Sequence, residues 1–354
     1  MPLSIKLLVS LSPLGRDPGK MLNATCITFF CNNHSKLEWY CYFLIMVCLF
    51  ALLLGFLGNI FAMLHYTYSI KSWTSSTIFL FNLTLCDFTW ILMVPFSVYY
   101  NLQKLAVYSS QIFCQFKRIF FNINIYGSIY FLTLISFDRY IGAVHPISSL
   151  KWWDKNKATF CTVAIWIFIF IESIPDFYYT FAVERRNDTV ACLEYIGEPL
   201  HFVVPFTVSR VIFGFLIPAT VIFTCYMLTL KALQQLKKRQ QRRNRIAKPL
   251  MLIFVAMIVF AIAFIPYHVM MIAVLLYRLN YQLNSDNISM IFTIYELTEI
   301  ICSISSCLDP IIFILVHKNF HQRFQMIKCP AKPGRHCCRS WKVRDITVAQ
   351  QRML

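Results

Sequence analysis

Charged residues are scarce in this sequence, and acidic residues are the scarcest. There are 16 Asp and Glu against 33 Lys and Arg, and charged residues make up 14% of the 354 residues while hydrophobic residues make up 58%. A soluble domain carries about 25% charged residues, so this composition excludes a soluble fold. The basic excess lies in short segments beside apolar runs, which favours contact with anionic lipid headgroups over binding of nucleic acid.

Several features of other functional classes are also missing. The 14 cysteines include no Cys-x-x-Cys pair and no His/Cys spacing suited to a metal. The sequence shows no nucleophile–base spacing, no internal repeat and no pair of broken helices, which argues against an enzyme, a transporter and a channel. The last apolar segment has no lysine for a retinal Schiff base, so an ordinary opsin is excluded.

Seven apolar segments are long enough to cross a bilayer, which takes about 20 residues in a helix. They cover roughly 41–67, 75–100, 112–143, 158–181, 203–231, 248–277 and 289–316. We therefore expect an all-α membrane protein, a seven-transmembrane helix bundle over 41–316. An extracellular segment, 1–40, would precede it and a cytoplasmic segment, 317–354, would follow.

Basic residues in short loops set the orientation. The stretch from Lys231 to Lys248 has eight basic residues and no acidic one, and the tail after Val316 has nine against a single Asp345. With seven crossings these stretches share one side, the cytoplasm, so the N-terminus is expected outside a plasma membrane. Four glycosylation sequons fall on the predicted outer side. They are at Asn23, Asn33, Asn187 and Asn287.

The tail begins with a short amphipathic pattern. Phe320, Phe324 and Ile327 recur at helical spacing and predict an eighth helix lying on the inner leaflet. Three cysteines follow, which are either S-palmitoylated or free thiols in a reducing cytosol. They are Cys329, Cys337 and Cys338.

Polar and proline residues mark each apolar segment in order. They are Gly58-Asn59, Asn82 to Asp87, Cys114 with Asp138-Arg139-Tyr140, Trp166 with Pro175, Pro218 with Tyr226, Phe260 to His268, and Asp309-Pro310. Over roughly residues 40–328 this set resembles the rhodopsin-like (class A) G-protein-coupled receptors. Four further stretches are similar to the nucleotide (purinergic) and succinate receptor group: Phe121 to Ser128, His145 to Ser148, Ile265 to Met270 and Ser305 to Pro310.

The resemblance implies a receptor that binds an extracellular small-molecule ligand and activates a heterotrimeric G protein, with arrestin and membrane lipids as further partners. It implies a cytoplasmic switch in which Arg139 pairs with Asp138 in one state and is freed in another. The other reading of this pair is a solvated helix end. The switch residues would be Asp138, Arg139, Tyr140, Tyr226, Asp309 and Pro310.

Two smaller sites are expected. Cys114 and Cys192 both lie on the outer, oxidising side, so we expect them to form a disulfide. Asn59, Asp87 and Asp309 lie at mid-membrane depth, where buried polar groups need partners. They form either a structural hydrogen-bond cluster or, as the resemblance implies, a site for Na⁺; no other cofactor is expected.

A ligand cavity is expected in the outer half of the bundle. Arg118 precedes Arg139 by 21 residues, about 31 Å along a helix at 1.5 Å per residue, so it lies near the outer surface. The resemblance implies that a basic residue here holds an anionic ligand. The candidate lining residues are Arg118, Phe121, Asn122, Tyr126, Arg210, His268, Met271, Glu296 and Glu299.

Two positions depart from the nucleotide and succinate receptors. Met271 stands where that group usually has Arg or Lys, and Glu299 stands where it usually has Arg. Either Glu299 pairs internally with Arg118 or Arg210, or the ligand carries positive charge. A nucleotide or carboxylate ligand and a ligand that is not anionic both stay open. A receptor-like protein that does not signal is a further alternative. Glu172 either belongs to the same cavity or faces lipid.

Overall fold

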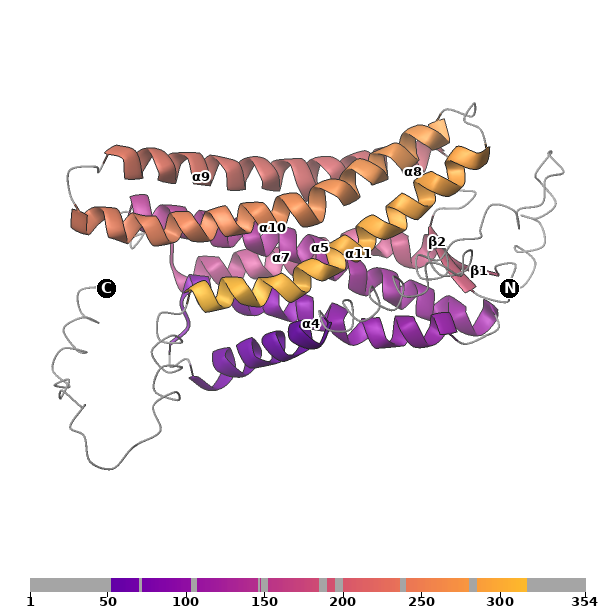
Figure 1. The fold of residues 1–354 in the computed structure, drawn as a ribbon, viewed down its shortest axis with the longest axis horizontal. Helices are drawn as coiled ribbons and strands as arrows, with labels where there is room; N and C mark the ends of the chain where they lie inside the picture. Colours follow the sequence, from indigo (N-terminus) through magenta and orange to yellow (C-terminus); the bar gives the residue numbers. More distant parts are fainter. Residues whose placement is uncertain are drawn as a thin grey trace, which may run out of the picture.

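Long helices run side by side along the molecule in the computed structural model (Figure 1). The structure describes residues 52–69, 72–102, 107–145, 147, 152–184, 190–194, 200–235, 240–279 and 285–316. Several sequence predictions lie outside these residues: the domain 1–40, the eighth helix, and the residues Asn23, Asn33, Asn187, Cys329, Cys337 and Cys338.

Seven helical spans are present in the described residues. The first is apolar over Leu52–Tyr68 and ends at Ser69, with the π-helical turn η2, His65–Ser69, as its last part. It is followed by α4 (Ser75–Leu102), α5 (Val107–Val144) and α7 (Lys155–Tyr179). The fifth span joins α8 (Leu200–Val211), the π-helical turn η3 (Ile212–Leu216) and α9 (Ile217–Gln235). The last two are α10 (Gln240–Leu279) and α11 (Ser285–Val316).

The predicted seven-helix bundle is confirmed, and the helices extend beyond most predicted ends. Five of them, within the residues searched, combine the length and hydropathy needed to cross a membrane. The fourth apolar segment was expected to stay helical to 181, but α7 ends at Tyr179. The β-branched and aromatic residues that follow favour a strand instead.

A short antiparallel hairpin caps one end of the bundle. Strand β1, Thr180–Glu184, pairs with β2, Val190–Glu194, and Ala182 lies opposite Cys192. The Gln111 side chain on α5 donates a hydrogen bond of 2.8 Å to the Thr180 carbonyl, which holds the hairpin against the bundle. We call this the hairpin end, and the end where α9 stops and α10 starts the loop end; Figure 1 shows them at opposite ends of the molecule.

Helix α5 is the centre of the bundle and contacts α4, α7, α9 and α10. In its most apolar stretch 72% of the residues are buried, against 22% for α7, so α7 lies at the periphery with its apolar side chains facing outward. Close approach of α5 to η3 depends on Gly214, because an added Cβ there would lie 2.6 Å from Cε1 of Tyr126. The central position of α5 allows it to carry polar side chains at both ends of the bundle.

Candidate functional site

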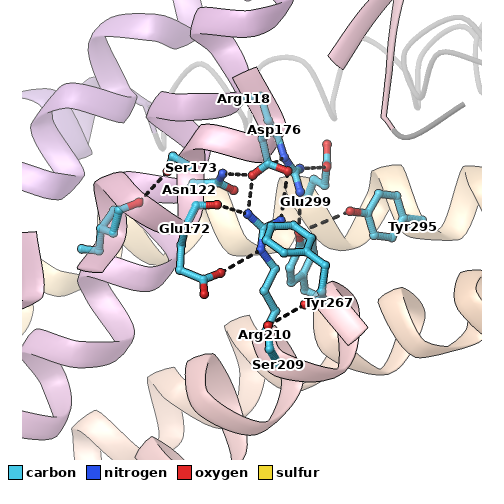
Figure 2. Close-up of polar contacts among 12 residues, drawn as sticks. Arg118, Asn122, Glu172, Ser173, Asp176, Ser209, Arg210, Tyr267, Tyr295 and Glu299 are labelled. Atoms are coloured by element: carbon cyan, nitrogen blue, oxygen red, sulfur yellow. Dashed lines mark hydrogen bonds and ion pairs between the residues drawn. The ribbon is translucent and has the colours of Figure 1, made fainter. Parts of the chain in front are cut away.

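Two arginines and three carboxylates meet near the hairpin end (Figure 2). We call Arg118, Glu172, Asp176, Arg210 and Glu299 the ion network; they come from α5, α7, α8 and α11. With every group ionised the network carries two positive and three negative charges. A charge in the membrane interior costs about 2.5–3.5 kcal/mol on insertion scales, so mutual pairing is what makes such a cluster tolerable.

Asp176 is the centre of the ion network and is fully buried. Arg210 donates to both of its carboxylate oxygens, with an Nη1–Oδ1 distance of 3.1 Å and a second bond from Nη2 to Oδ2. Asn122 donates to the same Oδ2, and Nε of Arg118 lies 4.0 Å from it. This one carboxylate therefore holds side chains of α5 and α8 against α7.

Glu299 joins α11 to this centre. Its Oε1 accepts a hydrogen bond of 3.2 Å from Nη1 of Arg118, so the internal pair that the sequence offered as one alternative is present. Nη2 of the same guanidinium donates at 3.2 Å to the hydroxyl of Tyr267, which also accepts from the hydroxyl of Tyr295 at 3.2 Å. Glu299 thus pairs with Arg118 and not with Arg210 among the contacts described.

Glu172 also belongs to the ion network. Of the two placements expected for it, beside the candidate lining residues or facing lipid, its contact with Arg210 agrees with the first. Its Oε2 lies 3.4 Å from Nε of Arg210, and its backbone carbonyl accepts from Nη2 of the same arginine at 2.8 Å. The pair lies beside Tyr126, Phe168, Ser209 and Gly214.

Aromatic rings cover both guanidinium groups. Arg118 lies over the ring of Phe121 at 5.3 Å from the centroid. Arg210 lies 4.2 Å from the ring centroid of Phe206 and 5.6 Å from that of Tyr126. Cation–π contacts of this kind are worth about 2 kcal/mol when the groups are desolvated, so the rings help to hold both cations in a buried site.

Two of the predicted lining residues lie apart from the ion pairs. His268 is buried with its ring stacked 4.5 Å from Phe215, and its Nδ1 lies 2.8 Å from the Phe264 carbonyl. Met271 packs in the hydrophobic core. Glu296 lies on α11, but its side chain is outside the described residues.

Sequence reasoning did not single out Asp176 or Tyr267 as site residues. Asp176 follows Pro175 near the end of an apolar helix, with no spacing that pairs it with Arg210, 34 residues away. The only signal was the burial cost of a carboxylate at such a position, which implies a charged partner.

A second polar cluster lies at mid-bundle. Oδ1 of Asp87 accepts from Asn124 and Ser128, each at 3.3 Å, and Asn124 also donates to Oγ of Ser306 at 2.6 Å. Asn59 donates to the Ser306 carbonyl at 2.9 Å, which ties the first span to α11. Asn124 and Ser306 therefore connect two residues of the predicted Na⁺ site, Asp87 and Asn59.

Oxygen acceptors exceed donors in this cluster. Among the described residues, Oδ1 of Asn59, Oδ1 of Asn124 and Oδ2 of Asp87 are buried without a hydrogen-bond partner. Asp309, also buried, interacts electrostatically with Asp87. A set of oxygen ligands that includes two carboxylates suits a hard cation such as Na⁺, so the residues present fit the predicted ion.

Asp138 is held by three neighbours at the loop end. Its Oδ2 accepts from Oγ of Ser76 on α4, and its Oδ1 accepts a 2.9 Å hydrogen bond from Nε1 of Trp153, just before α7. Nη2 of Arg139 lies 3.9 Å from the same carboxylate. The structure therefore contains the Asp138–Arg139 pair, held between α4 and α7.

The other predicted switch residues lie on neighbouring helices. The hydroxyl of Tyr140 lies 3.2 Å from Nε2 of His145, and the ring of Tyr226 lies 5.9 Å from that of Phe254 across α9 and α10. Pro310 on α11 approaches the first span so closely that a Cβ on Gly58 would lie 3.0 Å from its ring. The switch residues thus form separate contacts rather than one cluster.

Cys114 is buried on α5 and is disulfide-bonded. Cys192 lies on β2, and α5 contacts both strands of the hairpin. The side chain of Cys192 is outside the described residues, so the pairing of Cys114 with Cys192 stays a prediction. Asn287 lies in the first turn of α11, and its side chain is likewise outside them.

Comparison with known proteins gives the family. Residues 58–313 match the model of the 7 transmembrane receptor (rhodopsin family). The chain is 32% identical over 287 residues to P2Y purinoceptor 1 of Rattus norvegicus, covering 80% of this chain and 76% of the relative. It is 31% identical over 313 residues to P2Y purinoceptor 1 of Homo sapiens, covering 87% and 83%.

A receptor that is named after a different ligand is also similar to this chain. Lysophosphatidic acid receptor 6 of Gallus gallus is 30% identical over 274 residues, covering 75% of this chain and 88% of the relative. These relatives are receptors and not enzymes, and with the apolar helices they make the chain a multi-pass protein of the plasma membrane. The chain therefore belongs to the rhodopsin family of seven-transmembrane receptors and is a class A G-protein-coupled receptor of purinergic type.

Proposed function

We propose that an extracellular small molecule binds at the ion network and that its binding releases Arg139 from Asp138, which activates a heterotrimeric G protein. The observation that carries the proposal is the position of Arg118 and Asp138 on one helix, α5. They are 20 residues apart, about 30 Å at 1.5 Å per residue. A ligand that changes how α5 packs at one end can therefore bias the charge pair at the other.

The Arg139→Ala variant tests this coupling. Removing the guanidinium should abolish agonist-independent and agonist-driven nucleotide exchange on the G protein while surface expression stays at the wild-type level. The measurement is exchange of labelled GTP in membranes, with surface receptor quantified in parallel. Unchanged exchange at equal expression would mean that Arg139 is no more than a solvated helix end.

Two ligand classes are supported by different observations. The relatives named P2Y purinoceptor 1 and lysophosphatidic acid receptor 6 favour an anionic ligand such as a nucleotide, another phosphate or a carboxylate. The Arg118–Glu299 ion pair favours a ligand that is not anionic, because the guanidinium is already neutralised. Unit charges 4 Å apart interact by about 4 kcal/mol at an effective dielectric of 20, which is enough for Glu299 to cancel the attraction of Arg118 for an anion.

Substitution of Glu299 by Arg separates these two classes. We expect Glu299→Arg to gain responses to nucleotides, dicarboxylates or lysophospholipids that the wild type lacks, because the site would change from one excess negative charge to one excess positive charge. The screen compares both proteins against these anions and a set of amines, with Glu299→Gln as the uncharged control. A variant with no new response to any anion would show that Glu299 does not set ligand charge.

The remaining predicted sites complete the proposal. Extracellular placement of the hairpin end is supported by the basic residues around the loop between α9 and α10 and by the sequons. The mid-bundle cluster would bind Na⁺ through Asn59, Asp87 and Asp309 and favour the silent state. Palmitoylation of the tail, contact with lipid headgroups and binding of arrestin would take place on the cytoplasmic side.

A further inference from the structure

Asp176 makes the contacts that an anionic ligand would make in this bundle. Its two oxygens accept hydrogen bonds from Arg210 and Asn122, and Arg118 lies within ion-pair distance of Oδ2. Arginine pairs with carboxylates and phosphates through two parallel N–H donors, and Arg210 offers this arrangement to Asp176. The three donors and Asp176 are each at least 95% buried.

Exposure differs between the charges of the ion network. The side chains of Arg118 and Arg210 are 5% and 3% exposed, whereas those of Glu172 and Glu299 are 21% and 23% exposed. The cations are therefore covered by aromatic rings and by Asp176, while two carboxylates are the more exposed charges of the network. A ligand that enters the network meets negative charge first.

We propose that Asp176 occupies an anion subsite formed by Arg118, Asn122 and Arg210, and that it is the residue that excludes anionic ligands from this receptor. The group that the wild-type site accepts beside Glu172 and Glu299 is then neutral or cationic, such as an amine. This inference rests on the proposed function only for the location of the ligand. It adds a residue that determines ligand charge and that no feature of the sequence pattern identified.

The physical reason is competition at fixed donors. An external carboxylate or phosphate can reach the guanidinium groups only by displacing Asp176, and the displaced carboxylate would then be buried without a partner. Leaving a buried charge unpaired is strongly unfavourable, so displacement is opposed twice, by the lost pair and by the stranded charge. Removing the Asp176 carboxylate reverses this, because two buried guanidinium groups then lack that shared partner.

The test measures binding, so it does not depend on signalling. The full-length receptor is placed in lipid nanodiscs, and its thermal unfolding midpoint is recorded with acetate, succinate or ADP. We expect no shift for the wild type and a clear concentration-dependent rise for Asp176→Ala. Asp176→Asn, which has the same shape without the charge, should show a smaller rise and serves if the alanine variant does not fold.

Glu172→Ala is the matched control, because it removes a carboxylate from the same helix and from the same arginine but leaves Asp176 in place. It should gain no stabilisation by the three anions. The proposal is overturned if succinate or ADP stabilises the wild type and this effect is lost in Arg210→Gln, or if a folded Asp176 variant gains nothing. The signalling test with Arg139→Ala and this binding test are independent, because anion binding is measured without a G protein. The proposed function and the proposed role of Asp176 can therefore fail separately.

Discussion

The hydrogen bond from Trp153 to Asp138 leads to a quantitative prediction about basal activity. Nε1 of Trp153 donates at 2.9 Å to Oδ1 of a carboxylate that is 10% exposed. Hydrogen bonds to charged groups contribute about 1.5–3 kcal/mol, and we take the lower end because the site borders solvent. The bond holds Asp138 beside Arg139, so it favours the state in which the guanidinium is not free.

Trp153→Phe removes the donor and keeps an aromatic ring, which can still pack edge to face against Phe137, 5.3 Å away in the wild type. Loss of about 1.5 kcal/mol from the silent state alone shifts the equilibrium about tenfold. A receptor that is about 1% active without ligand would become about 10% active. The assay is agonist-independent nucleotide exchange, normalised to surface receptor.

Trp152→Phe is the control, because Trp152 packs on the same Phe137 ring at 6.2 Å, is 42% exposed and makes no described hydrogen bond to Asp138. Its basal exchange should stay near the wild-type level. Equal increases in both variants would show that ring packing, and not the hydrogen bond, restrains the receptor. No increase in Trp153→Phe would refute the assignment of Asp138 to the silent state.

Two further outcomes follow from packing and from the mid-bundle cluster. Gly214→Ala should lower the thermal unfolding midpoint, because its Cβ would overlap the Tyr126 ring; we expect a loss of about 1–3 kcal/mol in the free energy of unfolding. Gly142→Ala is the control and should not lower the midpoint, because a Cβ there would approach no side chain beyond its chain neighbours within 4 Å among the described residues. NaCl should raise the midpoint of the wild type more than KCl does, and Asp87→Asn should remove the difference, because Asp87 supplies an oxygen without a partner. An equal response to both salts in the wild type would contradict the sodium site.

The sequence was sufficient to predict the helices. A helix that spans the lipid forms all its backbone hydrogen bonds within itself and presents apolar side chains, so it appears in the sequence as a continuous apolar run. It was also sufficient for the position of Arg118, since distance along one helix is fixed by residue count. It missed the start of β1 at Thr180, where α7 gives way to a hairpin held by Gln111. A hairpin between two helices depends on pairing across a loop, which no helical pattern reveals.

The sequence also did not predict which side chains pair between helices, and Glu299 shows why. From sequence alone its carboxylate had two candidate cations, Arg118 and Arg210, and both lay in the same half of the bundle. The choice depends on the rotation of α5 and α8 about their axes, which is set by packing of surrounding side chains such as Tyr126 against Gly214. Side-chain pairing in a bundle is therefore a property of the whole core, whereas depth in the membrane is a property of each helix.

The charges of the ion network link four helices, α5, α7, α8 and α11. Asp176 on α7 binds Arg210 on α8 and Asn122 on α5, and Arg118 on α5 also binds Glu299 on α11. No one of these helices can shift without separating opposite charges in a region of low dielectric, where separation is costly. A ligand that replaces a single partner, for example by binding Glu299, therefore releases Arg118 to repack against Asp176. Because α5 continues to Asp138, we expect that local exchange of partners to alter how this helix holds the Asp138–Arg139 pair.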